Sequence, residues 1–420
     1  MKNLLLAAGL LCLSEGLAAQ TPAELANQAE KVLRAGDTKN GLALLEQAAN
    51  KAGATAESED HVGFLLAAVG RNVDGLVHFQ KAIALKSEFA PAHYHLGVAL
   101  WLAKDYERGL PELQAAAKLV PTNFDYRYHL GSAYFDVNDL EHAIDELREA
   151  VRLNATNAAA WIELGAALRK QGDVSAVDAY AKAVKVAPAD DATRNTYAGL
   201  LVQTRQPQRA IEESQIVLKR AGSTSTAREA AQMNIGYANL KTGEFDKAEA
   251  AYRASVELDA KSPAAHYNLA IALKMKDQLE ASKVELQRAI DLDPNLAEAH
   301  YSLGIAQWQL GDFPSAIEQM KAAIAVRPDY AEAHYMLGIT LKQSGDLDAA
   351  IPELKEAIRL DPTTPGPFNT LGQILRIKGD KAGSEGAFAT GAKLKRDKDM
   401  ELTNSLEQGM RGGMFPKPLQ

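Results

Sequence analysis

The chain has 420 residues, of which 47% are hydrophobic, 24% charged and only 6% aromatic. This mixture favours helices and argues against an all-β or collagen-like chain. The formal net charge is −8, so the chain lacks the positive field that binds phosphates, and we expect no nucleic-acid partner. The single cysteine, Cys12, lies in a segment that we expect to be removed, which leaves no thiol for disulfides or metal binding.

The N-terminus has the layout of a secretory signal peptide. Lys2 precedes an apolar run from Leu4 to Leu13, and small residues follow. We therefore expect a signal peptide over residues 1–19, cleaved near Ala18 to Gln20, and a periplasmic or secreted protein. The apolar run is too short to span a bilayer, so we expect no membrane span in the mature chain. A lipid-modified Cys12 is disfavoured because bulky leucines precede it, and an uncleaved N-terminal helix is the alternative.

The rest of the chain repeats with a period of 34 residues. The motifs AHYHLGVAL, AHYNLAIAL, AHYSLGIAQ and AHYMLGITL begin beside His93, His266, His300 and His334, and the last three histidines are spaced by 34. A period of this size is typical of stacked helical hairpins. Eleven repeats start at Pro22, Ala56, Ala90, Phe124, Ala158, Asp191, Glu229, Pro263, Ala297, Ala331 and Pro365. Positions are numbered below from the first residue of each repeat.

Small residues recur at the two positions where the helices of a hairpin would cross. Position 8 is glycine or alanine in all eleven repeats, as in Gly131 and Gly338. Position 20 is glycine, alanine or serine in every repeat once a one-residue deletion in the fifth repeat is allowed for. Two helices approach closely only where their facing residues are small, so this pattern predicts a helical hairpin in every repeat.

The turns within the hairpins carry a second signal. A glycine at position 15 stops the first helix, and the aspartate after it caps the second helix. This pair occurs as Gly36-Asp37, Gly172-Asp173, Gly311-Asp312, Gly345-Asp346 and Gly379-Asp380.

The repeats predict the organisation of the chain. Regular repeats 1–5 cover residues 22–190, and regular repeats 7–11 cover residues 229–398. Between them, residues 191–228 form an irregular sixth repeat with Arg205 at its turn and a four-residue insertion in the stretch from Ser223 to Arg228. A charged capping helix over residues 399–408 and a flexible tail over residues 409–420 complete the chain.

This pattern resembles the tetratricopeptide repeat family. The tenth repeat has His334, Leu337, Gly338 and Leu341, then Ala350, Leu354 and Pro362, and the fifth has the family's tryptophan as Trp161 before Leu164 and Gly165. The resemblance implies an all-α fold, a right-handed α-solenoid whose first helices line a concave groove. In this family ligands contact positions 2, 5, 6, 9, 12 and 13 of the first helices.

Aromatic residues gather at two of these groove positions. They are Tyr94, Tyr128, Tyr267, Tyr301 and Tyr335 at position 5, and Trp101, Phe135 and Trp308 at position 12. Tyrosine and tryptophan suit recognition of an extended peptide because they combine a large contact area with a polar group. Alternatively, the rings pack between adjacent first helices, and both interpretations stay open.

Polar residues complete the candidate groove. Asn234 and Asn268 occupy position 6 of consecutive repeats, similar to the asparagine ladder in the superhelical region of O-GlcNAc transferase. Amides at this spacing can hydrogen-bond the backbone of an extended chain without reading its sequence. Lys274 and Lys342 lie at position 12.

Catalytic motifs are not found. The sequence has no phosphate-binding loop, nucleophile elbow or HExxH zinc motif. His93, His266, His300 and His334 all lie at position 4, and equivalent positions on successive hairpins are roughly 10 Å apart, too far to share one metal ion. We expect these histidines to pack, and we expect no catalytic residue, cofactor or metal.

These observations predict a non-enzymatic scaffold outside the cytoplasm that binds a peptide segment or a partner protein in its groove. The partner could belong to an envelope complex, and the ends of the repeat array also offer a surface for self-association. Two alternatives are a targeting subunit for a separate glycosyltransferase-type enzyme and a carbohydrate-binding module. We expect no catalytic domain in the 22 residues after Lys398.

Overall fold

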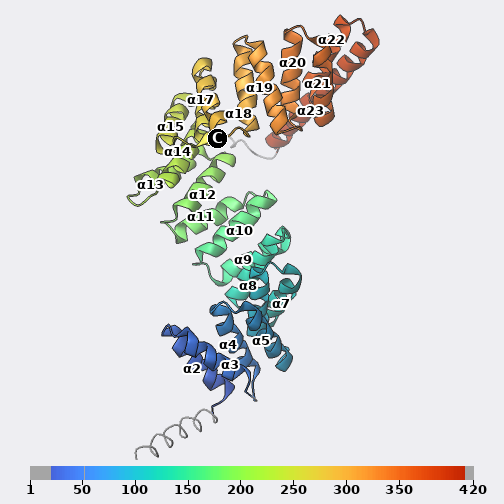
Figure 1. Cartoon of the computed structure of the whole chain (residues 1–420). Coiled ribbons are helices and arrows are strands. Elements are labelled where there is room, and N and C mark those ends of the chain that lie inside the picture. Colours follow the sequence, from blue (N-terminus) through green and yellow to red (C-terminus); the bar gives the residue numbers. More distant parts are fainter. Residues whose placement is uncertain (1–19, 52, 412–420) are drawn as a thin grey trace, which may run out of the picture. The chain divides into compact units, whose positions relative to one another are not determined.

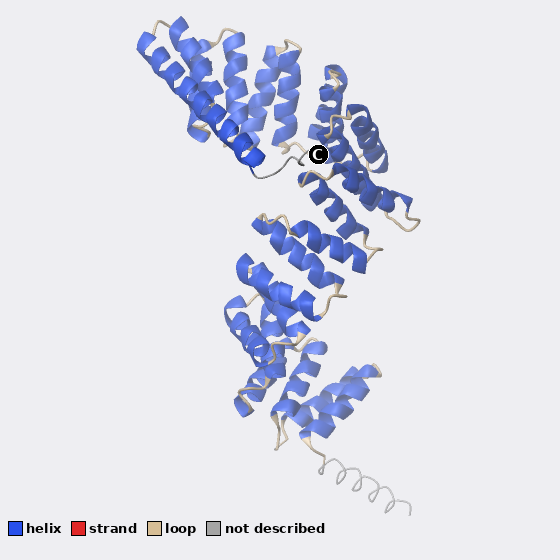
Figure 2. Cartoon of the chain, turned by 180° about the vertical axis from the view of Figure 1, so that it is seen from behind, coloured by secondary structure: helices blue, strands red, loops and turns tan. Residues whose placement is uncertain are grey.

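The computed structural model describes residues 20–51 and 53–411, and all regular secondary structure in these ranges is helical (Figures 1 and 2). Contacts between consecutive helices are those of a repeat solenoid, which confirms the expected all-α repeat fold. The chain divides into an N-terminal unit, residues 1–197, and a C-terminal unit, residues 198–420. No helix in the described ranges combines the length and the apolar character needed to cross a membrane.

The N-terminal unit consists of helical hairpins in which each helix packs on the next. The helices are α2 (Pro22–Arg34), α3 (Thr38–Ala49), α4 (Ala56–Ala68), α5 (Asn72–Leu85), α6 (Ala90–Leu102), α7 (Tyr106–Leu119), α8 (Phe124–Asp136), α9 (Leu140–Leu153), α10 (Ala158–Gln171) and α11 (Ala176–Val186). Even-numbered helices are the first helices of their hairpins, and odd-numbered helices are the second.

The C-terminal unit has the same construction. The boundary between the units falls within α12 (Asp191–Gln203). The helices that follow are α13 (Pro207–Lys219), α14 (Ser225–Lys241), α15 (Phe245–Leu258), α16 (Pro263–Met275), α17 (Leu279–Leu292), α18 (Ala297–Gln309), α19 (Phe313–Val326), α20 (Ala331–Gln343), α21 (Leu347–Leu360), α22 (Pro365–Ile377) and α23 (Lys381–Arg411).

In the hairpins with glycine at position 8, a large side chain of the second helix sits against that glycine. In the tenth repeat, a Cβ atom added to Gly338 of α20 would lie 2.7 Å from Cγ of Leu354 on α21. In the seventh, a Cβ atom on Gly236 would lie 2.5 Å from Cε1 of Tyr252. Leu354 and Tyr252 are fully buried. The glycine therefore makes room for the side chain that fills the centre of the hairpin.

The turns between the two helices adopt the expected geometry. Gly345 has a left-handed φ of 94°, and the side chain of Asp346 accepts a hydrogen bond of 3.0 Å from the backbone N–H of Ala349. The left-handed conformation also occurs without glycine at this position, at Lys104, Asn138, Arg205 and Asp277. The turn geometry is therefore kept even where the residue disfavours it.

Asp173 is an exception to the capping pattern. Its side chain accepts from the N–H of Ser175 at 2.8 Å, and α11 begins only at Ala176, so Asp173 is not the N-cap residue. The fifth repeat is one residue shorter than the others, which moves the start of its second helix.

Two further segments differ from the sequence prediction. The insertion before Glu229 extends a helix: α14 begins at Ser225, one turn earlier than expected. The segment 399–408, expected as a capping helix, is helical and continues α23 without a break. The predicted signal peptide and most of the predicted tail lie outside the described residues.

The packing at position 8 can be tested with a pair of glycines in the C-terminal unit. Gly338→Ala should destabilise the unit by about 1–3 kcal/mol, because the new methyl group overlaps Leu354. Gly386→Ala is the matched control, since the space around Gly386 in α23 is open; it should stabilise by about 0.5–1 kcal/mol through helix propensity. Urea denaturation followed by circular dichroism measures both changes. Equal stabilisation by the two substitutions would contradict the close contact between Gly338 and Leu354.

Candidate functional site

First helices of neighbouring hairpins contact one another directly. In the N-terminal unit these contacts join α4 with α6 and α6 with α8, and in the C-terminal unit they join α14 with α16 and α18 with α20. The candidate groove residues lie on first helices, and several of them bond to a residue of the next first helix, 35 positions later in the chain.

The predicted aromatic residues of the N-terminal unit all make such a contact. The hydroxyl of Tyr94 lies 3.1 Å from Nδ1 of His129, and the hydroxyl of Tyr128 donates to Oε1 of Glu163 at 2.6 Å. Similarly, Nε1 of Trp101 donates to Asp136 at 2.8 Å, and the ammonium of Lys170 lies 5.1 Å from the ring centre of Phe135. These four side chains are half-buried, which means that packing between first helices uses much of their surface.

The aromatic residues of the C-terminal unit are held in the same manner. The ring of Tyr301 lies 5.0 Å from that of Tyr330, at an interplanar angle of 43°. Tyr330 is the residue before α20, and the sequence prediction missed it. Tyr267 packs partly buried against the core between α16 and α18. Nε1 of Trp308 donates to the side-chain oxygen of Gln343. Tyr335 occupies space that is open only because the next first helix has Gly366 opposite it.

Burial also sets the protonation of the tyrosines. Desolvation, aided by the carboxylate of Asp125, raises the pKa of Tyr94 to about 12. Burial likewise raises the pKa of Tyr301 and of Tyr128, the latter also through its hydrogen bond to Glu163. The hydroxyls therefore stay neutral at physiological pH and serve as hydrogen-bonding groups.

Asn268 and Lys274 of α16 differ from these residues because repeat packing leaves their polar groups largely unused. Nδ2 of Asn268 has only a weak contact, 3.8 Å from the sulfur of Met233. Burial lowers the pKa of the Lys274 ammonium below the ordinary lysine value of 10.5, and among the described residues no carboxylate offsets this desolvation. Both side chains are half-buried.

The remaining two predicted residues are engaged by neighbouring helices. Nζ of Lys342 donates to the side-chain oxygen of Gln373 on α22. Asn234 of α14 lies near Gly199 of α12, where an added Cβ atom would be 3.4 Å from its side-chain oxygen. The structure therefore brings together the Tyr301 and Tyr330 rings and places Asn268 and Lys274 on one helix. Tyr94, Trp101, Tyr128 and Phe135 belong to the other compact unit.

A row of histidines at position 6 was missed by the sequence prediction. His61, His95 and His129 lie on α4, α6 and α8, and their spacing of 34 was visible in the sequence. His61 pairs with Glu30 at 3.2 Å and His95 with Asp60 at 2.8 Å. This row gives the first helices of the N-terminal unit a composition unlike that of the C-terminal unit.

The histidines at position 4 pack as the sequence predicted. In His266, Nδ1 lies 2.7 Å from Glu285 and Nε2 lies 3.2 Å from the backbone oxygen of Ala260. The side chain thus joins the two helices of its hairpin to the turn that precedes it. Trp161 has the same role, since its Nε1 donates to the oxygen of Ala155 at 2.9 Å. Within the described ranges, no group of three or more His, Cys, Asp or Glu side chains could hold a metal ion.

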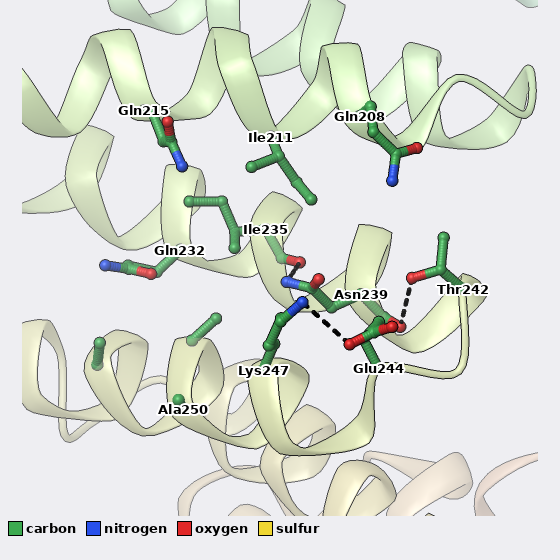
Figure 3. Close-up of a pocket in the computed structure, with 12 residues that line it drawn as sticks. Gln208, Ile211, Gln215, Gln232, Ile235, Asn239, Thr242, Glu244, Lys247 and Ala250 are labelled. Carbon is green, nitrogen blue, oxygen red and sulfur yellow. Dashed lines mark hydrogen bonds and ion pairs between the residues drawn. The ribbon is translucent and has the colours of Figure 1, made fainter.

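A polar cleft of about 610 Å³ lies between α13 and α15, with α14 as its floor (Figure 3). The amides that line it are Gln208, Gln215, Gln232 and Asn239. Nδ2 of Asn239 donates to the oxygen of Ile235 at 2.9 Å, and Lys247 pairs with Glu244 at 3.0 Å. Asn239 and Lys247 are therefore engaged within their own helices or with the adjacent turn.

Comparison with known families identifies the repeat. A family model described as tetratricopeptide repeat matches residues 65–124, 198–263 and 301–365, and one described as TPR repeat matches residues 131–172 and 276–311. The chain belongs to the tetratricopeptide repeat family, and it is a scaffold of the kind that serves protein–protein interaction.

Similar solved structures cover the chain unevenly. A crystal structure of MamA is 25% identical and covers 40% of this chain and 97% of its own, with a TM-score of 0.38. MamA from Desulfovibrio magneticus RS-1 is 23% identical over 41% of this chain and 97% of its own, with a TM-score of 0.39. The structure of Naa15/Naa10 bound to HypK-THB contains a chain that is 16% identical to this one. The match covers 88% of this chain and 67% of that chain, with a TM-score of 0.41. No curated protein matches the chain significantly.

The role of the position 4 histidines predicts unequal effects of two substitutions. Glu285→Ala should destabilise the C-terminal unit by about 1.5–3 kcal/mol, because it removes a hydrogen bond between the buried His266 and a carboxylate. Gln319→Ala removes the equivalent partner of His300, a neutral hydrogen bond of 2.8 Å, and should cost about 1 kcal/mol. Thermal denaturation compares the two variants. Equal losses would show that the histidine and glutamate do not act as a pair.

Proposed function

We propose that the protein is a non-enzymatic scaffold outside the cytoplasm, and that the first helices of its C-terminal unit bind an extended segment of a partner in the cell envelope. The observation that carries this proposal is the pair Asn268 and Lys274 on α16. Their polar groups are half-buried, and repeat packing does not use them.

The carboxamide of Asn268 suits a peptide backbone. An extended backbone presents an N–H and a C=O together, and a carboxamide offers one acceptor and two donors to match them. Its present contact with the sulfur of Met233 is a weak hydrogen bond. A bound peptide would therefore replace a poor interaction with good ones, without selecting a particular sequence.

The ammonium of Lys274 favours a ligand that carries a negative charge. Burial disfavours its charged form, and a carboxylate of the ligand would offset that cost. Lys342 and Arg376 occupy the same repeat position as Lys274, position 12, on α20 and α22, and Lys241 occupies position 13 on α14. A segment with an acidic side chain or a free C-terminus fits this set of cations.

The proposal that the protein is exported rests on its N-terminal sequence. Lys2, the apolar run from Leu4 to Leu13 and the small residues before Gln20 match a cleavable signal peptide. A mature chain that begins near Gln20 would start directly before α2, whose N-terminus is capped by Thr21: its Oγ1 accepts from the N–H of Glu24 at 3.2 Å.

A double substitution on α16 tests the binding surface. Asn268→Ala with Lys274→Ala should abolish capture of partners from an envelope extract, because it removes both unused polar groups and leaves the tyrosine packing intact. Gln287→Ala with Lys321→Ala, on the exposed surfaces of α17 and α19, is the matched control and should capture normally. Quantitative mass spectrometry of the captured proteins, with circular dichroism as a check of folding, gives the result. Undiminished capture by the α16 variant would refute the proposal.

Cell fractionation and N-terminal sequencing test the location. The mature protein should begin near Gln20 and leave the cytoplasm, because the signal peptide directs export and is cleaved. Recovery of a cytoplasmic protein that still begins at Met1 would exclude export. Substitution of Leu5 and Leu6 by aspartate should block processing, since a charged apolar region does not function as a signal.

A further inference from the structure

The sixth repeat differs from the others at position 24, the position of the large side chain that faces position 8. In the other ten repeats, with the one-residue deletion of the fifth repeat allowed for, this residue is leucine, methionine, phenylalanine or tyrosine. They are Leu45, Phe79, Leu113, Leu147, Tyr180, Tyr252, Leu286, Met320, Leu354 and Phe388. The sixth repeat has Ser214. Its second helix, α13, therefore lacks the large side chain that the second helices of the other repeats share.

Ser214 is buried together with its hydroxyl group. The residue has no exposed surface, and within the described part of the chain its Oγ atom has no hydrogen-bond partner. In the unfolded chain water hydrogen-bonds this hydroxyl, so its burial without a partner disfavours the folded hairpin. A leucine would bury additional apolar surface instead. The sixth hairpin is therefore less stable than a hairpin with leucine at position 24.

The other buried residues of α13 compensate for Ser214 only in part. They are Ala210 and Val217. Val217 is larger than the alanine, serine or glycine that the other repeats have at position 27, and it restores apolar volume about one turn away from Ser214. It does not satisfy the hydroxyl, and no side chain larger than valine is buried on this described helix. In contrast, α17 of the eighth repeat buries Leu286 and Ile290.

The eighth repeat is a matched comparison for the sixth within the same chain. Both have alanine at position 8, as Ala198 and Ala270. Both have a residue other than glycine in the left-handed turn, Arg205 with a φ of 60° and Asp277 with a φ of 59°. In both, the N-cap residue of the second helix makes no side-chain capping hydrogen bond. The turn therefore does not distinguish the two hairpins, whereas the buried residues at positions 24 and 27 do.

A repeat array opens first at its weakest hairpin. Its stability is approximately a sum over the hairpins and the interfaces between neighbours, so different hairpins open locally at different free energies. The contacts of the chain also divide into the units 1–197 and 198–420 within α12, the first helix of the sixth repeat. The weak hairpin and the division of the contacts therefore fall in the same repeat.

We propose that the sixth repeat is a built-in opening point of the array. Helix α13 detaches from its hairpin while the seventh and later hairpins stay folded. Because α13 packs on α14, its detachment uncovers the surface of α14 that it covers. The scaffold thus has one hairpin that yields to heat, denaturant or a protease before the others. This opening does not depend on ligand binding at α16.

Hydrogen exchange of the full chain, followed by mass spectrometry and corrected for intrinsic exchange rates, tests the opening. Amides of α13 should exchange at least tenfold faster than those of α17, because the sixth hairpin opens at a lower free energy. A tenfold difference corresponds to about 1.4 kcal/mol. Equal protection of the two helices, or stronger protection of α13, would overturn the proposal.

Exchanging the buried residues between the two hairpins tests the cause. Ser214→Leu with Val217→Ala gives the sixth hairpin the pair found in the eighth, Leu286 and Ala289, and should slow exchange of α13 at least tenfold. The reciprocal variant, Leu286→Ser with Ala289→Val, should accelerate exchange of α17 at least tenfold, and it decides the question if the first variant does not fold. Unchanged exchange of α17 in the reciprocal variant, or of α13 in a folded first variant, would overturn the role of Ser214.

Two controls separate local opening of the hairpin from other effects. Gln215→Leu adds a leucine on the exposed side of α13 and should leave its exchange unchanged, since this side chain does not reach the centre of the hairpin. A slowing as large as that caused by Ser214→Leu with Val217→Ala would refute the central packing. Protection of α21 should not change in any of these variants. If the Ser214 variant slows exchange of α13 and α21 equally, the array opens as one unit, and the proposed opening point is wrong.

Discussion

The fold depends on one contact that recurs in the hairpins: a small residue on the first helix against a large, buried side chain on the second. Where the small residue is glycine, as at Gly131 and Gly338, the facing leucine leaves no room even for a Cβ atom. Contacts of this kind fix the distance between the two helices. They also fix which residues of the first helix point away from the hairpin, and these are the residues available to neighbouring repeats or ligands.

A second set of contacts links the hairpins to one another. Side chains at position 4, such as His266, bond both to the second helix and to the preceding turn. Side chains at positions 5 and 12, such as Tyr128 and Trp101, reach the next first helix. Groove aromatics are therefore partly structural, and the binding surface that we propose lies where the repeating contact is absent. Asn268 and Lys274 have polar groups that packing leaves largely unused.

The sequence predicted the fold well because its signals are local and repeated. Glycine at position 8, and the turn glycine at position 15 where it occurs, are visible without knowledge of distant contacts. The sequence could not decide whether Tyr94 or Tyr301 is a ligand contact or a packing residue, because that depends on side chains about 30 or more residues away. His61, His95 and His129 were overlooked although they repeat every 34 residues.

The central claim is that the small residue at position 8 and the large residue facing it form one interdependent contact. A double-mutant cycle on Gly131 and Leu147, measured by urea denaturation, tests this most directly. Gly131→Ala should destabilise the wild-type protein, because its Cβ atom would lie 2.7 Å from Leu147. In the Leu147→Ala background the same change should be neutral or stabilising, with a coupling energy of about 1 kcal/mol or more. Additive effects of the two substitutions would contradict the account.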